Sequence, residues 1–242
     1  MNGLIILSLH WFASLFCQSF FLHRYSSHKM FTMNKFWEKF FYLATFILQG
    51  PSFLNPRSYA IMHQRHHLYS DQEQDPHSPK NSNNVVEMMI KTYHYYQELV
   101  KESLSQTKNN DLPSWNKLDK FAVSKTNIIL WIFIYPCIYY AFNVDYIYYI
   151  LLPIHFFIGP IQGAIVNWCG HRYGYRNYEL EDYSKNTLKM DFPLMGELYQ
   201  NNHHRTGHKF NFAHKWYEID LTYICSIPLI YLGVINPSEG SR

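Results

Sequence analysis

Three histidines lie at positions i, i+3 and i+4 of the stretch His63-Gln64-Arg65-His66-His67. On a helix, residues at this spacing share one face. Neutral imidazole is the commonest metal ligand in proteins and suits iron, copper and zinc. Packing alone gives no reason for three neighbouring imidazoles, so the stretch predicts a helix that presents metal ligands.

Three further segments carry ligand-type residues. One begins at His23 and ends at His28, and another places Asn167 and His171 at i and i+4. The third, Gln200-Asn201-Asn202-His203-His204, repeats the histidine pattern with glutamine in the first place. The candidate metal ligands are His23, His28, His63, His66, His67, Asn167, His171, Gln200, His203 and His204. Ten residues exceed the roughly four to six ligands of one metal, so the count predicts two metals.

Long apolar runs predict the fold class. Residues 4–22, 128–142 and 146–166 are expected to span a membrane, because a spanning helix needs about 20 apolar residues. Residues 128–142 number only 15, but their tyrosines can lie at an interface, and they are expected to form a hairpin with residues 146–166, kinked at their prolines. Residues 40–54 and 221–235 also number 15, and Gln49-Gly50-Pro51 and Pro228 interrupt them, so we expect them to lie at the interface. The sequence therefore predicts an all-α integral membrane protein with about three transmembrane helices, interfacial helices and a cytoplasmic helical cap that holds a di-metal site.

The distribution of positive charge predicts the orientation. With three spans, and with no crossing at residues 40–54, all four ligand segments lie on one side of the membrane. All 21 Lys and Arg lie in residues 24–125, in residues 172–215 and at Arg242, and none lies in the turn 143–145. Because cytoplasmic loops carry the excess of Lys and Arg, the histidine side is expected to be cytoplasmic.

Net charge and cysteine spacing exclude several other classes of protein. A net charge of +3, with no basic stripe, gives no case for a nucleic-acid partner. The four cysteines lie far apart without a Cys-x-x-Cys pair, which argues against a zinc knuckle, an iron–sulfur cluster and a disulfide framework. No cleavable signal is evident in the first apolar run. We expect residues 1–242 to form a single domain, with an amphipathic helix at 85–108 on the water side and a linker at 109–124.

No Glu-x-x-His motif of the soluble di-iron bundles occurs in the chain. Two metals that are held mainly by nitrogen ligands and face the bilayer indicate that the protein activates oxygen for a reaction on a lipid-borne substrate.

Taken together, the motifs resemble a known family. The segments H-R-Y-S-S-H, H-Q-R-H-H, D-P-H at Asp75-Pro76-His77, N-W-C-G-H and G-E-L-Y-Q-N-N-H-H resemble, in order and spacing, the successive boxes of the membrane fatty acyl-CoA desaturases of the stearoyl-CoA type. The resemblance extends from about residue 4 to residue 235. It implies that the boxes bind two iron ions, with Asn167 acting through water. It also implies O2 as co-substrate and a cis double bond, commonly at Δ9, in a saturated acyl chain held in a kinked tunnel.

The chain departs from this family in four places. Gln200 stands where the acyl-CoA enzymes have histidine, and Ile61-Met62 stands where the animal enzymes place an Arg-Asp pair that contacts the CoA end. The N-terminal span of the animal enzymes has no counterpart before residue 4. No fused cytochrome b5 motif is present, so we expect a separate electron donor of the ferredoxin, flavodoxin or cytochrome b5 type. The substrate expected from the resemblance is a fatty acyl thioester, acyl-CoA, or another lipid, and the compartment is the bacterial inner membrane.

Some polar residues have other expected roles. Asp75, His77 and Glu197 are expected beside the ligands, where Glu197 orients an imidazole and His77 orients a loop. His10 and His155 lie within spans, where we expect packing or tunnel lining. The alternative function is a membrane di-iron hydroxylase or oxygenase of lipid or alkane, which begins with the same hydrogen abstraction. A metal transporter would place its ligands near the bilayer midplane, whereas nearly all of these histidines lie outside the spans.

Overall fold

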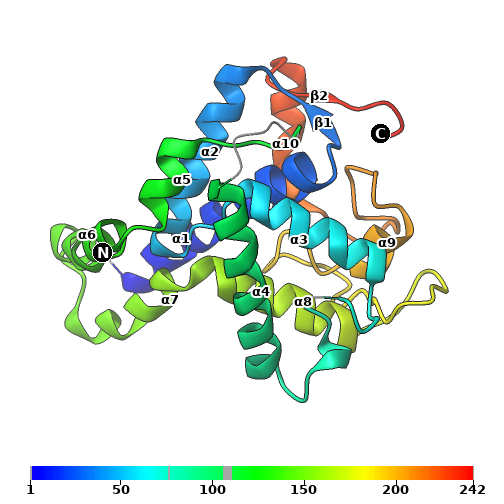
Figure 1. Cartoon of the computed structure of the whole chain (residues 1–242), viewed down its shortest axis with the longest axis horizontal. Helices are drawn as coiled ribbons and strands as arrows, with labels where there is room; N and C mark the ends of the chain where they lie inside the picture. Colours follow the sequence, from blue (N-terminus) through cyan, green and yellow to red (C-terminus); the bar gives the residue numbers. More distant parts are fainter. Residues whose placement is uncertain (1, 76, 106–110, 242) are drawn as a thin grey trace.

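The computed structural model describes residues 2–75, 77–105 and 111–241, and within them the chain is almost entirely helical (Figure 1). Pro76 of the D-P-H segment, the end of the expected helix 85–108 and the first residues of the expected linker lie outside the described residues. The two short strands, β1 (Phe31–Thr32) and β2 (Asn236–Pro237), pair antiparallel and join the segment after the first long helix to the C-terminal segment.

The first helix is the longest apolar element. α1 (Gly3–Cys17) begins with Asn2, whose side chain accepts a hydrogen bond from the backbone N–H of Leu4, and continues into the π-helical segment η1 (Gln18–Ser27). The helix Gly3–Ser27 is long and apolar enough to cross a membrane. It extends beyond the expected span 4–22 and carries His23 within its π-helical part. Such wider turns are uncommon and often occur at functional sites.

The two expected spans 128–142 and 146–166 each fall within a pair of helices that meet at a sharp bend. α5 (Asn116–Ala122) and α6 (Lys125–Ala141) form a pair bent by 68°. After a turn at Asn143 the chain passes through η4 (Tyr146–Leu151) and α7 (Leu152–Phe156), then bends by 67° into α8 (Ile158–Arg172). Pro160 lies in the first turn of α8, where its missing N–H costs least, so it favours a new helix start there. If each bent pair is one span, the described residues contain three.

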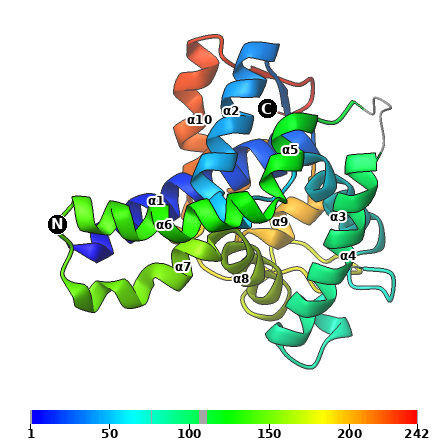
Figure 2. The ribbon, with the colours of Figure 1, turned by 60° about the vertical axis from the view of Figure 1, so that its left-hand side comes forward.

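Two further apolar helices, one of which packs on α1, lie side by side. α2 (Lys35–Gln49) and α10 (Leu221–Tyr231) stand together at the upper end of Figure 1 and of Figure 2. α2 buries one face against the core and leaves Phe36, Phe40 and Ile47 exposed on the other. It ends at the short turn η2 (Gly50–Ser52), where Gly50 adopts a φ of +55° that favours glycine. The expected position of residues 40–54 and 221–235 at the membrane interface remains a prediction.

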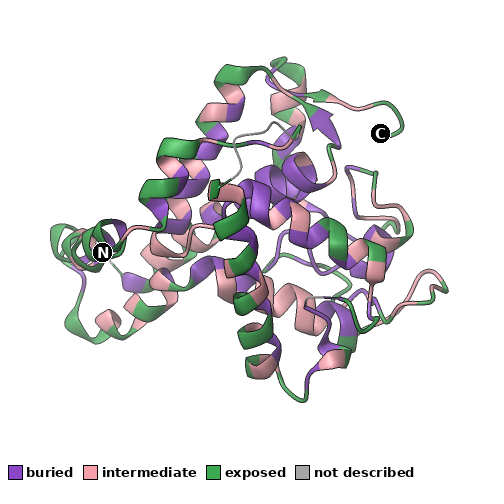
Figure 3. Ribbon diagram, viewed as in Figure 1, coloured by how far each residue is buried: buried purple, intermediate pink, exposed green. Residues whose placement is uncertain are grey.

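The cap that carries the histidines packs around η1. It consists of α3 (Pro56–Tyr69), the turn η3 (Pro79–Asn81), α4 (Val85–Ser105) and α9 (Gln200–Arg205). α3 contacts both η1 and α4. Figure 3 shows that buried residues concentrate where η1, α3 and α9 meet, whereas the outer turns of α2, α4 and α6 are exposed. The main core cluster beneath them is aromatic, built on Phe20, Phe21, Phe31, Phe210 and Phe212.

Candidate metal centre

Five histidines form one compact group, here called the first centre. It consists of His23, His28, His63, His67 and His203. The Nε2 atoms of these rings converge: His28 lies 2.8 Å from His63, His63 lies 3.0 Å from His67, and His203 lies 2.9 Å from His67 and 3.0 Å from His23. Two ligands at right angles, each about 2.1 Å from a metal, lie about 3.0 Å apart. The five nitrogens therefore have the spacing of ligands around one metal ion.

Three further histidines form the second centre. His66 of α3, His171 of α8 and His204 of α9 bring their ring nitrogens together. The Nε2 atoms of His66 and His204 lie 3.3 Å apart, and Nε2 of His171 is buried without a hydrogen-bond partner. A buried polar nitrogen without a partner is costly, and a metal ion would satisfy it. The residues of both centres thus fit a metal.

The histidine triad of α3 is divided between the two centres. His63 and His67 belong to the first centre and His66 to the second, and α9 divides His203 and His204 in the same way. Adjacent helical residues point about 100° apart, so a helix that passes between two metals can serve both. The two centres are therefore neighbours that share α3 and α9.

Each of four histidines is held by a carboxylate, buried in three cases and half-buried at Asp182. Asp75 accepts from Nδ1 of His66 at 2.8 Å, and Asp71 accepts from Nδ1 of His171 at 2.8 Å. The remaining two pairs are His204 with Asp182 at 2.7 Å and His23 with Glu197 at 2.6 Å, again through Nδ1. With the proton on Nδ1, Nε2 keeps its lone pair for a metal, which is how carboxylates orient metal-binding histidines.

The carboxylates remain ionised in spite of their burial. Burial alone would raise the pKa of Asp71, but the hydrogen bond with His171 lowers it to about 2. Burial alone would likewise raise the pKa of Glu197, but its electrostatic interactions with His23 and Arg24 lower it to about 2. Arg24 is fully buried, bonds Glu197 at 2.6 Å and Asp220 at 2.8 Å, and so ties the first centre to the C-terminal segment.

Sequence reasoning identified two of the four carboxylates. Asp75 and Glu197 stand beside histidines, as expected, whereas Asp71 and Asp182 were missed. Asp71 follows His67 by four residues, a proximity that could have indicated it. Asp182 gave no such signal, because it lies in a polar loop far from every histidine box in the sequence.

His77 lies closer to the histidines than the sequence indicated. Its ring stacks on His66 with 4.4 Å between centroids, and its Nδ1 is buried without a hydrogen-bond partner. Burial lowers the pKa of His77 to about 3, so the ring is neutral. His66, Asp75 and His77 form a further group of ligand-type atoms at the edge of the second centre.

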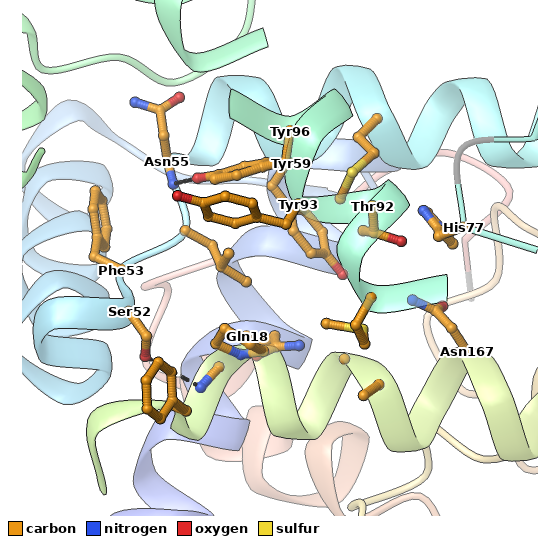
Figure 4. Close-up of a pocket in the computed structure, with 18 of the residues that line it drawn as sticks. Gln18, Ser52, Phe53, Asn55, Tyr59, His77, Thr92, Tyr93, Tyr96 and Asn167 are labelled. Carbon is orange, nitrogen blue, oxygen red and sulfur yellow. Dashed lines mark hydrogen bonds between the residues drawn. The ribbon is translucent and has the colours of Figure 1, made fainter. Parts of the chain in front are cut away.

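The two amide candidates take different positions. Asn167 lies one turn before His171 on α8 and lines the cavity described below, near His77 (Figure 4). Gln200 is buried, and its Nε2 donates to the backbone carbonyl of Glu197 at 2.7 Å. Its side chain packs so closely on Gly170 that a Cβ there would lie 2.4 Å from Cγ of Gln200. The amide N–H group of Gln200 is therefore engaged by a backbone carbonyl.

A mostly apolar cavity of about 1060 Å³ reaches the histidines. His23, His63, His77 and Asn167 are among its lining residues. Figure 4 shows His77 and Asn167 on one side of the cavity and Phe53 on the opposite side. Cavities of about 300–1,000 Å³ bind small molecules, and this one is at the upper limit of that range. Its shape and lining suit a long apolar chain that passes the metal-binding residues.

Within the apolar helices, two histidines outside both centres form a chain of hydrogen bonds. Nε2 of His10 lies 2.6 Å from the carbonyl of Leu48, Nδ1 of His10 lies 2.7 Å from Nδ1 of His155, and Nε2 of His155 lies 2.8 Å from the hydroxyl of Tyr139. Because the carbonyl only accepts, neutral rings require His10 to donate to Leu48, His155 to donate to His10, and Tyr139 to donate to His155. The chain packs four elements together, as the packing role expected for His10 and His155 requires.

Comparison with known proteins agrees with this site. The sequence model of the family described as "Fatty acid desaturase" matches residues 2–223. Delta-9 desaturase-like 4 protein of Arabidopsis thaliana is 27% identical over 91% of this chain and 72% of its own length. Hex-5-enoyl-[acyl-carrier protein] acetylenase of Moorena producens is 26% identical over 93% and 73%. The sn-1 stearoyl-lipid 9-desaturase of Anabaena variabilis is 25% identical over 95% and 81%. With the match over nearly its whole length, this chain belongs to the fatty acid desaturase family, whose members are oxidoreductases.

Proposed function

We propose that this protein inserts a cis double bond, at Δ9, into a saturated fatty acyl chain in an O2-dependent reaction, with one iron ion in each centre. The observation that carries the proposal is the apolar cavity that ends at His63 and Asn167, beside the two groups of histidines. The Δ9 position is supported by the names of two relatives, a Delta-9 desaturase-like protein and a stearoyl-lipid 9-desaturase.

The reaction balances with an external donor. Two C–H bonds of the acyl chain break and one carbon–carbon double bond forms. The four electrons that reduce O2 to two water molecules come half from the acyl chain and half from the donor. The two irons, when bound, would supply this oxygen reduction.

The protein's own residues bind the acyl chain and orient the histidine side chains. The apolar cavity walls exclude water from the acyl chain and hold it beside the histidines. The carboxylates of Asp71, Asp75, Asp182 and Glu197 fix the orientation of four imidazoles, and the proton on Nδ1 keeps each Nε2 free as a ligand. Since an unactivated carbon must lie close to the reacting centre, rigid placement by buried pairs is the main requirement.

The proposal also includes the membrane side of the site, the electron donor and the carrier of the acyl chain. The histidine side of the membrane is the cytoplasmic side, in accordance with the Lys and Arg distribution, and the compartment is a bacterial inner membrane. A separate protein of the ferredoxin, flavodoxin or cytochrome b5 type supplies the electrons. The sequence resemblance predicted an acyl thioester, acyl-CoA, as the substrate. The residues at the opening of the cavity indicate which carrier holds the acyl chain.

Expression in a host that makes no unsaturated acyl chains, together with a matching donor protein, tests the proposal. Mass spectrometry with double-bond localisation is expected to find a new cis-Δ9 monoene in the lipids of this host. His66→Ala, which removes a buried imidazole of the second centre, is expected to abolish that product. Hydroxylated chains in place of the monoene would instead assign the protein as an oxygenase.

A further inference from the structure

The wall of the cavity is open on one side, and the side chains at the opening are apolar. Seven residues that line the cavity are also 46–63% exposed. They are Val86, Ile90 and Tyr93 of α4, Val123 and Ile128 at the junction of α5 and α6, Ile132 of α6, and Phe157 at the bend between α7 and α8. We refer to these seven residues as the apolar mouth.

The apolar mouth lies where the cap meets the apolar helices. α4 contacts both α5 and α8, and α6 begins directly beyond α5 (Figure 2). Ile128 and Ile132 belong to α6, half of a bent pair that is apolar enough to cross a membrane. The mouth is therefore continuous with the lipid-facing surface of that helix.

Hydrophobic free energy indicates what covers the mouth. Burial of a large apolar side chain away from water is favourable, so seven half-exposed ones would be costly in water. Contiguous exposed apolar patches of this kind mark sites that meet a membrane, a ligand or another protein. Since the patch continues along α6, lipid acyl chains are the covering that accounts for it.

The charged residues that line the cavity indicate which carrier of the acyl chain can enter through the apolar mouth. Among the described residues that line the cavity there is no lysine and no arginine, and its carboxylates are the buried Asp119 and Glu197. A coenzyme A carrier has several phosphate groups, which proteins bind with arginine and lysine. Met62 lines the cavity at the position where the resemblance places one member of the Arg-Asp pair that contacts the CoA end.

Cations do occur near the mouth, but outside its lining. Lys120 on α5 and Lys125 on α6 are exposed, and Lys91 on α4 is exposed with its amine paired to Glu87 at 2.8 Å. Lysines just outside an apolar surface suit the headgroup level of a bilayer, where their stems cover apolar groups and their amines reach lipid phosphates.

We propose that the cavity opens sideways into the bilayer through the apolar mouth, and that the substrate is an acyl chain of a membrane glycerolipid that enters without leaving the membrane. The inference rests on the proposed function and assigns its carrier. It differs from the acyl-CoA that the sequence resemblance predicted, and the experiment separates the two.

The first test supplies the same stearoyl chain on two carriers to the full-length protein, purified in lipid nanodiscs with iron and a reductant. One arm holds distearoyl phosphatidylcholine in the disc, and the other holds stearoyl-CoA in a disc of unreactive lipid. Unsaturated product in the phosphatidylcholine arm, at least tenfold above that in the CoA arm, is expected. Product confined to the CoA arm would overturn the lipid carrier and leave the desaturase function standing. No product in either arm would contradict the function itself, and the carrier with it.

A second readout does not depend on turnover. Phosphatidylcholine with a diazirine in one acyl chain is irradiated with the protein, and the labelled residues are identified by mass spectrometry. We expect labels on residues deep in the cavity, such as Met62 and Tyr96, as well as at Ile90. Labels confined to the outer surface of α6, with the cavity labelled only by the corresponding acyl-CoA probe, would refute lateral entry.

A matched pair of variants tests the mouth itself. Ile90→Lys places a charge among the seven apolar residues, whereas His94→Lys adds the same amine one turn further along α4, outside the cavity lining. A charge in apolar surroundings is costly at the centre of a membrane and less so toward its interface, so about a tenfold loss of lipid labelling is expected for Ile90→Lys. His94→Lys is expected to label as the unaltered protein does. Equal labelling of both variants would show that lipids do not enter here.

Discussion

His23 and Glu197, 174 positions apart in the sequence, are joined by a hydrogen bond of 2.6 Å between Nδ1 and Oε2. Glu197 also bonds the buried Arg24, so a single carboxylate connects the π-helical end of the first helix to the segment before the last histidine box. The first centre therefore depends on a residue that is not itself one of its five histidines.

Glu197→Gln is expected to weaken the first centre. The amide cannot hold His23 with a full charge, and it leaves Arg24 with less compensation for its burial. Loss of a residue that orients a metal-binding histidine typically costs about 10–100-fold in metal affinity or activity. Iron analysis and activity of the purified variant measure this loss. The exposed Glu181→Gln serves as the control and is expected to keep its iron, and an unchanged iron content in Glu197→Gln would contradict the role.

The two centres are expected to be separable. His171 belongs only to the second centre and His28 only to the first. Because each variant leaves the histidines of the other centre in place, His171→Ala and His28→Ala are each expected to reduce the iron content toward one ion per chain. Mössbauer spectra should show different remaining sites in the two variants. Identical spectra from both would contradict the division of the histidines.

Gly170→Ala is expected to destabilise the protein in spite of its helical position. Alanine is normally favoured over glycine inside a helix by about 1 kcal/mol, but here its Cβ would lie 2.4 Å from Cγ of Gln200. A lower Tm is therefore expected for Gly170→Ala alone. The double variant Gly170→Ala/Gln200→Ala removes the nearest obstructing atom, Cγ, and leaves Cβ at 3.2 Å, so it should recover much of the Tm relative to Gln200→Ala. A double variant as unstable as the sum of the two single changes would argue against the close contact.

Tyr139→Phe removes the hydroxyl that donates to Nε2 of His155. A buried acceptor left without a partner costs about 1–3 kcal/mol, so the free energy of unfolding should fall by that amount. The neighbouring Tyr140 is 78% exposed, and Tyr140→Phe is expected to change stability by no more than about 0.5 kcal/mol. Thermal unfolding in detergent compares the two variants. Equal Tm values would show that the hydrogen-bonded chain contributes nothing.

Much of the site could be predicted because its residues occur as local motifs. The spacing of His63, His66 and His67 and of His203 and His204 indicated both the helices and the metal-binding role, and the apolar runs indicated the spanning helices. The division of these histidines between two centres depends on how α3 and α9 pack, which no local pattern records. For the same reason Asp182 was missed, since it meets His204 only in the folded chain.

The bend at Phe157 shows another limit of the sequence. Apolarity continues unbroken across it, and proline in membrane helices usually gives a tolerated kink, so a continuous span at 146–166 was expected. The chain instead starts a new helix, α8, and this change of direction brings Asn167 and His171 to the cavity and the second centre. Tertiary packing decided between a kink and a new helix.

Isotope labelling measures directly whether the protein forms a double bond or a carbon–oxygen bond. The purified iron-loaded protein receives a stearoyl substrate carrying deuterium on both C9 and C10, under 18O2, and the product is analysed by mass spectrometry. The account predicts a cis-9 monoene that has lost one hydrogen isotope from each of the two carbons and contains no 18O. A product that retains 18O on the acyl chain would contradict it and identify a hydroxylase.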